Sequence, residues 1–291
     1  MSENSNLMKK IQLCFPKLSK GQKMIAQYIM SDYDKAAFMT AAKLGDKVGV
    51  SESTVVRFAN ELGFKGYPQM QQELQKMIRT RLTTVQRIEM TSDYSNEENV
   101  FKKVLKADID NLRITMDEID FRVFDEAANS IVEAKHIYIV ALRSSRALAD
   151  FLAFYLNLIR GNIHVVTHSI SDIFEILFRV NSEDLVIGIG FPRYTSKTIE
   201  ALDYAKSQGA KVLAITDNLL SPLTSHSDYT LIARSNMESF VDSLVAPLSL
   251  LNALIVAVGI KEKNKVSASF ARLEEIWEKY NIYTYKEKNK Q

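Results

Sequence analysis

The chain has 291 residues, of which 46% are apolar and 25% charged, so it has the composition of an ordinary globular protein and the length of two domains. Its single cysteine, Cys14, excludes an internal disulfide and a cysteine-based zinc site, and its four histidines lack the spacing of metal ligands. Residues 1–90 hold 14 Lys and Arg against 8 Asp and Glu, whereas the other 201 residues hold 23 against 27. This uneven charge suggests a polyanion as the partner of the N-terminal part. We expect no metal and no other cofactor.

Targeting and membrane segments are not expected. The first 15 residues lack the apolar run and small-residue cleavage site of a signal peptide. The longest apolar stretch, residues 244–260, is interrupted by Pro247, Ser249 and Asn252. It is more typical of a buried helix than of a membrane span, which needs about 20 apolar residues. The sequence therefore predicts a cytoplasmic protein without membrane contact.

Short helices are predicted from Leu18 onward. Ser19 is placed to cap the first of them. Its apolar stripe is formed by Met24, Ile25, Tyr28 and Ile29.

Two further helices follow closely on each other. Thr40 caps a helix over residues 41–48, which Gly49 ends, and the next begins at Ser51 or Ser53 and runs to Leu62, ahead of Gly63. Two helices joined by a short turn that includes glycine are a helix-turn-helix candidate.

The second helix of this pair has two faces. Its core stripe consists of Val55, Phe58, Ala59 and Leu62. Its open face near the helix start consists of Ser51, Ser53, Thr54, Val56, Arg57 and Asn60. A recognition helix presents its N-terminal residues to base edges in the major groove. Arginine can bind guanine, asparagine can bind adenine, and a valine methyl can contact thymine.

Hydroxyl and lysine side chains around this helix suit a different contact. Ser51, Ser53 and Lys65 are better placed for DNA phosphates, which position a protein without specifying sequence. The alternative interpretation is a three-helix packing unit in which Arg57 is only a solvated surface charge.

A longer stretch favours the DNA-binding interpretation. Residues 49-GVSESTVVRFANELGFKGYPQMQQEL-74 resemble the N-terminal domain of the RpiR/MurR family of bacterial transcriptional regulators. In that family a VS-x-x-T-V-x-RF-x-x-x-LGF-x-G run spans the recognition helix and the following turn. The resemblance covers residues 1–78 and implies an all-α helix-turn-helix domain that binds double-stranded DNA, with Arg57 as a DNA contact.

Residues 79–115 are predicted to be a linker with a helical segment. Residues 79–100 lose clean periodicity and gather Thr, Ser, Asn and Glu. A helix resumes at about Glu97, with Val100, Val104, Leu105, Ile109 and Leu112 at helical spacing. This helix is expected either to lie on the second domain or to pair with a copy of itself.

A second domain is predicted over residues 116–285, followed by a charged tail at 286–291. Its apolar strands are 136–142, 162–167, 184–191, 211–216 and 229–233, and its intervening helices are 144–160, 170–180 and 195–208. Continuous apolar strands that alternate with helices indicate an α/β fold with a doubly wound parallel sheet. Such sheets bind ligands at the carboxyl ends of their strands, at a topological switch point.

Two strand-to-helix turns carry candidate ligand groups. The first, 141-ALRSSRALA-149, contains Arg143, Ser144 and Ser145 at a helix start, where backbone N–H groups and the helix dipole favour an anion. The second, 188-GIGFPRYTSKT-198, contains Gly190, Arg193, Tyr194 and Thr195. The alternative is that the hydroxyls only cap the two helices.

The second domain resembles the SIS (sugar isomerase) domain, which occurs in aldose–ketose isomerases and as the sensor half of RpiR-type regulators. The SIS pattern has a Gly-x-Gly-x-Ser turn after the first strand and an S-x-S-G-x-T turn after the third. Ser145 matches the serine of the first turn and Thr195 the threonine of the second. The resemblance implies a phosphosugar site.

The chain departs from the SIS pattern at both turns. Ala141 and Arg143 stand where the glycines would be, while Gly190, Pro192 and Arg193 replace Ser, Ser and Gly. Two hydroxyls are lost and two arginines gained. The site is therefore expected either to bind a phosphate by charge or to prefer a sugar acid or unphosphorylated sugar.

Catalysis is not expected. Isomerisation needs a general base beside the substrate, and the candidates are Glu238 and His226. Glu238, which is also a candidate ligand contact, precedes a helix, and His226 lies in a polar turn, so no paired acid and base emerges. The last helical stretches, 239–260 and 267–280, carry Trp277, Tyr280 and Tyr283, which indicate packing or a dimer interface.

The sequence thus predicts a transcriptional regulator, and a repressor in particular, of carbohydrate metabolism genes. Its effector would be a sugar phosphate or sugar acid, and a homodimer or dimer of dimers would bind a palindromic operator. One alternative is a sugar-phosphate isomerase with an appended DNA-binding domain. The other is a regulator whose SIS domain serves only as a dimerisation scaffold.

Overall fold

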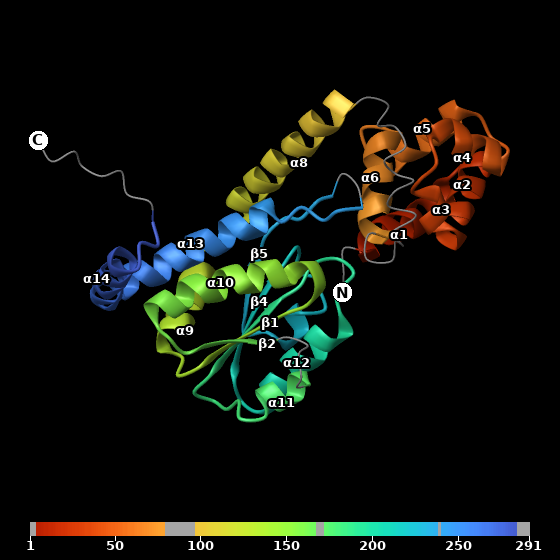
Figure 1. Cartoon of the computed structure of the whole chain (residues 1–291). Coiled ribbons are helices and arrows are strands. Elements are labelled where there is room, and N and C mark those ends of the chain that lie inside the picture. The colour runs from red at the N-terminus through yellow and green to blue at the C-terminus, as the bar shows by residue number, and fades with distance from the viewer. Residues whose placement is uncertain (1–3, 79–96, 167–171, 238–239, 284–291) are drawn as a thin grey trace, which may run out of the picture. The chain divides into compact units, whose positions relative to one another are not determined.

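The computed structural model describes residues 4–78, 97–166, 172–237 and 240–283. The chain divides into two compact units, Met1–Val100 and Phe101–Gln291. The first is helical, and the second contains the sheet and the remaining helices (Figure 1). The predicted two-part fold class is confirmed.

The N-terminal unit is a small bundle of helices. Its elements are α1 (Asn4–Cys14), the short turn η1 (Phe15–Lys17), α2 (Lys20–Ser31), α3 (Tyr33–Ala36), α4 (Ala41–Val48), α5 (Glu52–Glu61) and α6 (Tyr67–Ile78). Ser19 caps α2 in a reciprocal capping box with Gln22, and the Thr40 hydroxyl accepts a hydrogen bond from the Lys43 amide at the start of α4. Both predicted caps are confirmed.

The apolar face of α2 differs from the prediction at one position. Ile25, Ala26 and Ile29 are fully buried, whereas Met24 is 40% exposed. The prediction for Met24 was wrong because the buried stripe is rotated toward Ala26.

Side chains of helix α6 donate hydrogen bonds to the connection between α3 and α4. The buried Tyr67 hydroxyl donates to the Met39 carbonyl over 2.6 Å, and Gln71 Nε2 donates to the same oxygen over 2.9 Å. Gln75 Nε2 donates to the Ala37 carbonyl over 3.0 Å. Burial raises the pKa of Tyr67, so its hydroxyl stays protonated and serves as a donor.

The second unit is built on a five-stranded parallel sheet in the order β2-β1-β3-β4-β5. Its strands are β1 (Ile137–Ala141), β2 (Ile163–Val166), β3 (Leu185–Ile189), β4 (Lys211–Thr216) and β5 (Tyr229–Ile232). All five lie within the predicted strands. Every residue of β1 and β3 is buried, as expected for strands that are covered on both faces.

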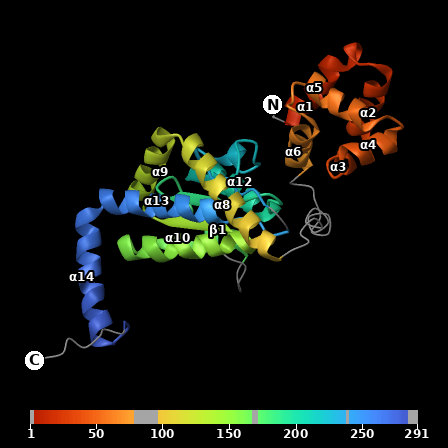
Figure 2. The same cartoon turned by 90° about the horizontal axis from the view of Figure 1, so that it is seen from above.

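Helices cover both faces of the sheet and give three layers (Figures 1 and 2). One face packs against α9 (Phe121–Glu133), α10 (Arg146–Ile159) and α13 (Val245–Lys261), and the other against α11 (Ile173–Leu177) and α12 (Ser196–Ser207). Alternate residues of β1 serve the two layers: Ile137 and Ile139 face the first, while Tyr138 and Val140 face the second.

Several helices differ from the sequence predictions. The helix predicted over residues 170–180 is only the five-residue α11, and the two at the C-terminal end are α13 and α14 (Lys263–Lys279). Helices α1, α3, α6 and α9 were not predicted. Asp120 caps α9 by accepting hydrogen bonds from the amides of Arg122 and Val123.

Helix α8 (Glu97–Glu118) packs on the second unit, as one of the two expectations for it stated. Asn111 is fully buried and exchanges two hydrogen bonds with the backbone of Asn236, at 2.9 and 3.0 Å. The predicted linker boundary at residue 115 therefore falls inside a helix. Seven of its large apolar side chains are still exposed: Val100, Phe101, Val104, Leu105, Ile109, Ile114 and Met116.

Helix α14 contributes no buried residue to the described part of the domain. It leaves α13 at a bend of 101° and extends away from the sheet layers (Figure 2). Tyr280 and Tyr283 are 64% and 51% exposed, and the ring of Tyr283 packs against that of Trp277 at a centroid distance of 5.2 Å. A dimer interface at these residues remains a prediction. Within the described residues no single helix is long and apolar enough to span a membrane; α13 and α14 meet that test only as a bent pair.

Candidate functional sites

Helix α5 presents the two faces that the sequence predicts. Its core stripe of Val55, Phe58, Ala59 and Leu62 is at most 3% exposed. On the opposite face Ser51, Ser53, Arg57 and Asn60 are exposed, while Thr54 and Val56 are half-buried. The candidate DNA contacts of this helix therefore share one accessible surface.

The turn between α4 and α5 has the close geometry of a helix-turn-helix motif. Gly49 has a left-handed backbone with φ 75°, and the Val50 amide donates to the Gly45 carbonyl over 2.8 Å. A Cβ atom at Gly45 would lie only 2.7 Å from the Val50 carbonyl oxygen. The absence of a side chain at Gly45 thus sets the crossing of α4 and α5.

Gly45→Ala is expected to destabilise the N-terminal unit by about 1–3 kcal/mol, although alanine is normally the better helix former by about 1 kcal/mol. The added methyl group meets backbone atoms, which cannot move aside as a flexible side chain would. The matched control is Gly49→Ala, which has open space and only left-handed strain. Calorimetric unfolding of the full chain measures both, and an unchanged or raised Tm for Gly45→Ala would contradict the steric account.

Hydroxyl groups cluster at the start of α5. The Ser51 hydroxyl lies 3.0 Å from that of Ser53 and 2.9 Å from that of Thr54. Although Ser51 is the N-cap residue, its side chain makes no capping bond there. Arg57 Nε donates to the Ser53 carbonyl over 3.2 Å, which holds the guanidinium near the helix start. These groups are ordered against each other yet remain accessible.

A basic residue that sequence reasoning missed lies near the start of α5. A Cβ atom at Gly21 would lie 3.2 Å from Val50 and 3.4 Å from Thr54, so the first turn of α2 lies beside the start of α5. Lys20, at that turn, is exposed. Lys65 is also exposed and occupies the connection between α5 and α6, where its amide donates to Gln69 Oε1 over 2.7 Å. The sequence did carry one signal for Lys20: it stands next to the small Gly21 at the start of a helix that Ser19 caps.

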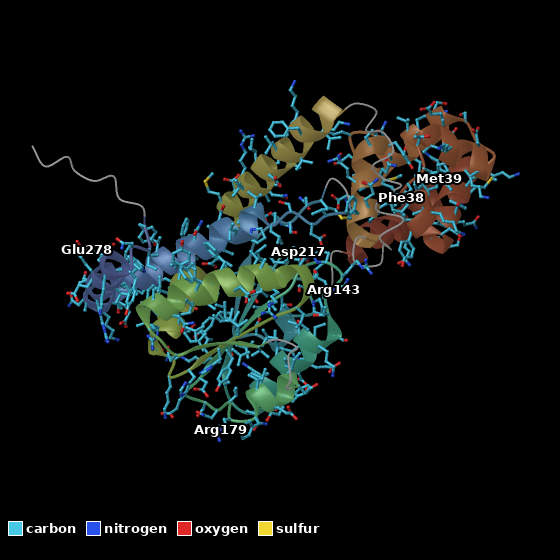
Figure 3. All side chains as sticks on the ribbon, in the orientation of Figure 1. Phe38, Met39, Arg143, Arg179, Asp217 and Glu278 are labelled. Atoms are coloured by element: carbon cyan, nitrogen blue, oxygen red, sulfur yellow. The ribbon has the colours of Figure 1, made fainter. Side chains whose placement is uncertain are left out.

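In the second unit, the two candidate turns lie at the same edge of the sheet. β1 and β3 are neighbours with Ala141 paired to Ile189, so the turns that follow them leave side by side. The strand order reverses between β1 and β3, which is the topological switch point of this fold. Arg143 and Asp217 lie at this end of the domain, and Arg179 lies at the opposite end (Figure 3).

Both turns hold an arginine in a left-handed backbone conformation. φ is 57° at Arg143 and 67° at Arg193. Arginine adopts this conformation at a cost of about 1–2 kcal/mol, whereas glycine adopts it freely. Both side chains are exposed at the edge of the sheet. The structure thus keeps two cations at positions where the backbone favours glycine.

The other polar side chains of the first turn differ in their exposure and in their hydrogen bonds. Ser144 is exposed, and Ser145 is 6% exposed at the start of α10 without a side-chain capping bond. Arg146 Nε donates to Asp150 Oδ2 over 3.1 Å, so its charge is paired within α10. Arg143 is therefore the arginine of this turn that stays a candidate for contact with an anion.

The second turn contains both packing and polar positions. Gly190 is buried, and a Cβ atom there would lie 3.0 Å from Leu223, so the structure gives it a packing role, and ligand contact remains a prediction. Thr195 is half-buried at the start of α12, and its hydroxyl lies 2.7 Å from that of Thr198. The Tyr194 hydroxyl donates to Asp217 Oδ1 over 2.6 Å.

The candidate base that the structure describes, His226, does not lie at the turns. Glu238 lies outside the described residues. His226 Nδ1 lies 3.1 Å from Asp203 Oδ1, in the middle of α12 rather than at the carboxyl ends of β1 and β3. Among the described residues no group of three or more His, Cys, Asp or Glu could hold a metal ion.

Family models match both units of the chain. The model of the helix-turn-helix domain of the rpiR family matches residues 5–81, and the SIS domain model matches residues 130–257. The chain belongs to the RpiR family. It therefore carries a helix-turn-helix domain and a SIS domain in the order of that family's transcriptional regulators.

Relatives of the RpiR-family chain match over most of its length. An uncharacterized HTH-type transcriptional regulator of Clostridium perfringens is 27% identical over 252 residues, which cover 84% of this chain and 89% of the relative. The HTH-type transcriptional regulator HexR of Pseudomonas aeruginosa is 25% identical over 275 residues. This match covers 93% of this chain and 95% of the HexR chain.

Solved structures share the fold. The sugar isomerase domain of the RpiR transcription factor from Sphaerobacter thermophilus has a TM-score of 0.57 and 27% identity, and covers 60% of this chain and 97% of its own. The NanR protein of Vibrio vulnificus, solved with ManNAc-6P, has a TM-score of 0.56 and 20% identity, and covers 93% of this chain and 98% of its own.

Proposed function

We propose that this RpiR-family regulator represses carbohydrate metabolism genes in the cytoplasm and is released from its operator by a phosphorylated sugar or a related sugar acid. The observation that carries the proposal is the pair of left-handed arginines, Arg143 and Arg193, at the switch point of the SIS sheet. A backbone strain retained at two adjacent turns favours a function for the side chains that cause it.

DNA recognition is assigned to the exposed face of α5. Arg57 and Asn60 read base edges in the major groove, with Val56 and Thr54 as apolar or hydroxyl contacts. Ser51, Ser53, Lys65 and Lys20 contact phosphates. This assignment is supported by the exposure of all these residues except the half-buried Thr54 and Val56, and by the excess of Lys and Arg in the first 90 residues.

Lys65→Ala is expected to weaken binding to all DNA sequences by a similar factor and to reduce the salt dependence of log K by about one ion. Lys20→Ala should do the same if the first turn of α2 contacts the backbone. Fluorescence anisotropy across a range of salt concentrations measures the slope. Lys206→Ala, which removes a lysine paired with Asp228 in the other unit, is the control for net charge. If Lys65→Ala keeps the wild-type salt dependence of log K, this lysine does not contact the DNA.

The effector is assigned to the turns after β1 and β3. Two arginines on neighbouring turns supply charge-assisted hydrogen bonds for a phosphate or carboxylate, and the start of α10 adds backbone donors. The similarity in fold to NanR, which was solved with ManNAc-6P, supports a phosphorylated sugar as the first class to test. Ser144, Ser145, Tyr194, Thr195 and Glu238 remain candidate contacts.

A second copy of the chain is the proposed partner in the operator complex. Helix α13 is mostly apolar, and four of its large side chains are exposed: Val245, Leu248, Val256 and Ile260. With the outward apolar residues of α8 and the unburied α14, they form the kind of surface that subunit contacts cover. A dimer would present two recognition helices to half-sites roughly 34 Å apart, one helical turn of DNA.

Thermal shift of the full chain against a panel of hexose and pentose phosphates and sugar acids tests the effector assignment. One compound should raise Tm in a concentration-dependent way without being converted, as monitored by NMR of the sugar. Conversion would favour the isomerase alternative. A panel in which no compound raises Tm would favour the scaffold alternative.

A further inference from the structure

A buried polar cluster lies at the carboxyl end of β4, next to the turn that follows β3. Thr216, Asp217 and Ser221 are 0%, 5% and 2% exposed. The Asp217 carboxylate accepts hydrogen bonds from Tyr194 Oη at 2.6 Å and from Asn218 Nδ2 at 2.8 Å. Burying a carboxylate is costly unless it is fully hydrogen-bonded, so loss of one donor destabilises this arrangement.

Tyr194 connects this cluster to the turn that follows β3, which we call the effector turn. It directly precedes Thr195 and follows the left-handed Arg193, so movement of the turn moves its ring. Burial and the neighbouring Asp217 carboxylate raise the pKa of Tyr194, so the hydroxyl stays protonated and donates. Since the hydroxyl donates to Asp217, it helps to hold the turn in position.

Arg234 ties the other side of the cluster to α8. This residue follows β5, and its Nη1 donates to the Asp217 carbonyl over 3.4 Å. Its Nε donates to Glu118 Oε2 over 2.7 Å, and its backbone amide donates to Thr115 Oγ1 over 2.8 Å. Glu118 and Thr115 belong to the last turns of α8, so one side chain links the end of β4 with that helix.

Helix α8 is the first described element after residue 78, and the segment before it joins the SIS unit to the helix-turn-helix unit along the chain. Figure 1 shows the C-terminal end of α8 near the start of α13, with the rest of α8 extending outward from there. Within the SIS unit, Thr115 and Asn111 anchor it to the residues that follow β5, over 119 and 125 positions of sequence. A change at Arg234 therefore acts on the described element of the SIS unit that lies nearest in sequence to the DNA-binding unit.

We propose that Tyr194, Asp217 and Arg234 are positioning residues that transmit the state of the effector turn to α8. We call this connection between the effector turn and α8 the relay. Its biological role rests on the proposed function, because it needs an effector at the turn. A ligand that moves the turn after β3 alters the Tyr194–Asp217 hydrogen bond, and the backbone of Asp217 carries the change to Arg234. Because coupling between two sites is reciprocal, a change at α8 must also reach the turn.

Hydrogen–deuterium exchange on the full chain without any sugar tests the relay itself. Tyr194→Phe, which removes only the hydroxyl, should speed amide exchange in residues 108–118 of α8 at least threefold. Arg234→Gln should speed exchange in residues 190–196 by a similar factor. Tyr204→Phe on α12 and the exposed Arg179→Gln are the matched controls and should change neither segment. Exchange altered only around each substituted side chain would overturn the relay.

The affinity of the protein for its operator, measured with and without sugar, tests the role of the relay in regulation. For a sugar that releases wild-type protein, Arg234→Gln should reduce the change in operator Kd to within about twofold, while the Kd for the sugar changes less than about threefold. A retained response would overturn the role of Arg234. If no sugar acts on the wild type, the effector assignment fails, and the exchange result still decides whether the relay exists.

Discussion

Arg57→Ala is expected to weaken binding to the specific operator by about 1–3 kcal/mol, and to relax sequence preference at one base pair of each half-site. The side chain is exposed on the face of α5 opposite the core stripe, and its Nε bond to the Ser53 carbonyl holds the guanidinium at the helix start. A bidentate contact from arginine to guanine is the strongest direct readout that this face can make. Competition binding against operators with single base-pair changes measures both effects.

Two controls separate base readout from phosphate contact. Arg57→Lys keeps the charge but loses the forked geometry, so it should lose specificity while retaining most nonspecific binding. Nonspecific DNA should be bound by Arg57→Ala only slightly more weakly than by the wild type. If specific and nonspecific binding fall equally, Arg57 contacts phosphate and another residue of the face reads the base.

Arg143→Gly is expected to separate stability from ligand binding. Glycine relieves the left-handed strain at φ 57° and restores the SIS pattern, so the free energy of unfolding should rise by about 1 kcal/mol. Loss of a charge-assisted contact should at the same time weaken the effector by about 1.5–3 kcal/mol, roughly 10- to 150-fold. Denaturant unfolding and isothermal titration with the sugar identified by thermal shift measure the two quantities.

Arg143→Ala is the matched variant because it removes the guanidinium but leaves a side chain in the left-handed region. It should lose effector affinity to the same extent without gaining stability. A gain in stability with unchanged effector affinity in Arg143→Gly would mean that the arginine has no part in the ligand site. Arg193→Gly and Arg193→Ala repeat the comparison at the second turn, where φ is 67°.

Local signals in the sequence were sufficient for much of the fold. Ser19 and Thr40 cap the helices that follow them, and Gly49 ends α4, because capping depends on a few neighbouring residues. The strands were recognisable because both faces of a parallel sheet are buried, which requires continuous apolar runs. The meeting of the Ser145 and Thr195 turns also followed, since the carboxyl ends of parallel strands lie at one edge.

Features that depend on long-range contacts were not accessible in this way. Met24 was placed in the core because periodicity alone does not tell which of two adjacent stripes faces inward. Helix α9 buries Ala127, Ala128, Ser130 and Ile131, and small residues give a weak apolar pattern. The pairing of Asn111 with Asn236 spans 125 residues, so no local pattern predicts that α8 belongs to the SIS unit.

The chemistry of the ligand turns shows the same limit. The sequence displayed Arg143 and Arg193 where the SIS pattern has glycine, but not that the backbone keeps the glycine conformation there. It also did not show that the Tyr194 hydroxyl donates to Asp217. Lys20 was missed because its proximity to α5 arises only when Gly21 packs against Val50.

Fluorescence anisotropy with DNA from upstream of the protein's own and neighbouring genes tests the central claim most directly, in the absence and presence of a panel of phosphorylated sugars and sugar acids. We predict tight, salt-sensitive binding of the full chain to one of these DNA segments, and at least tenfold weaker binding when one sugar of the panel is present. Binding that is equally strong to all DNA, or that no sugar changes while thermal shift shows one of them bound, would contradict an effector-controlled regulator.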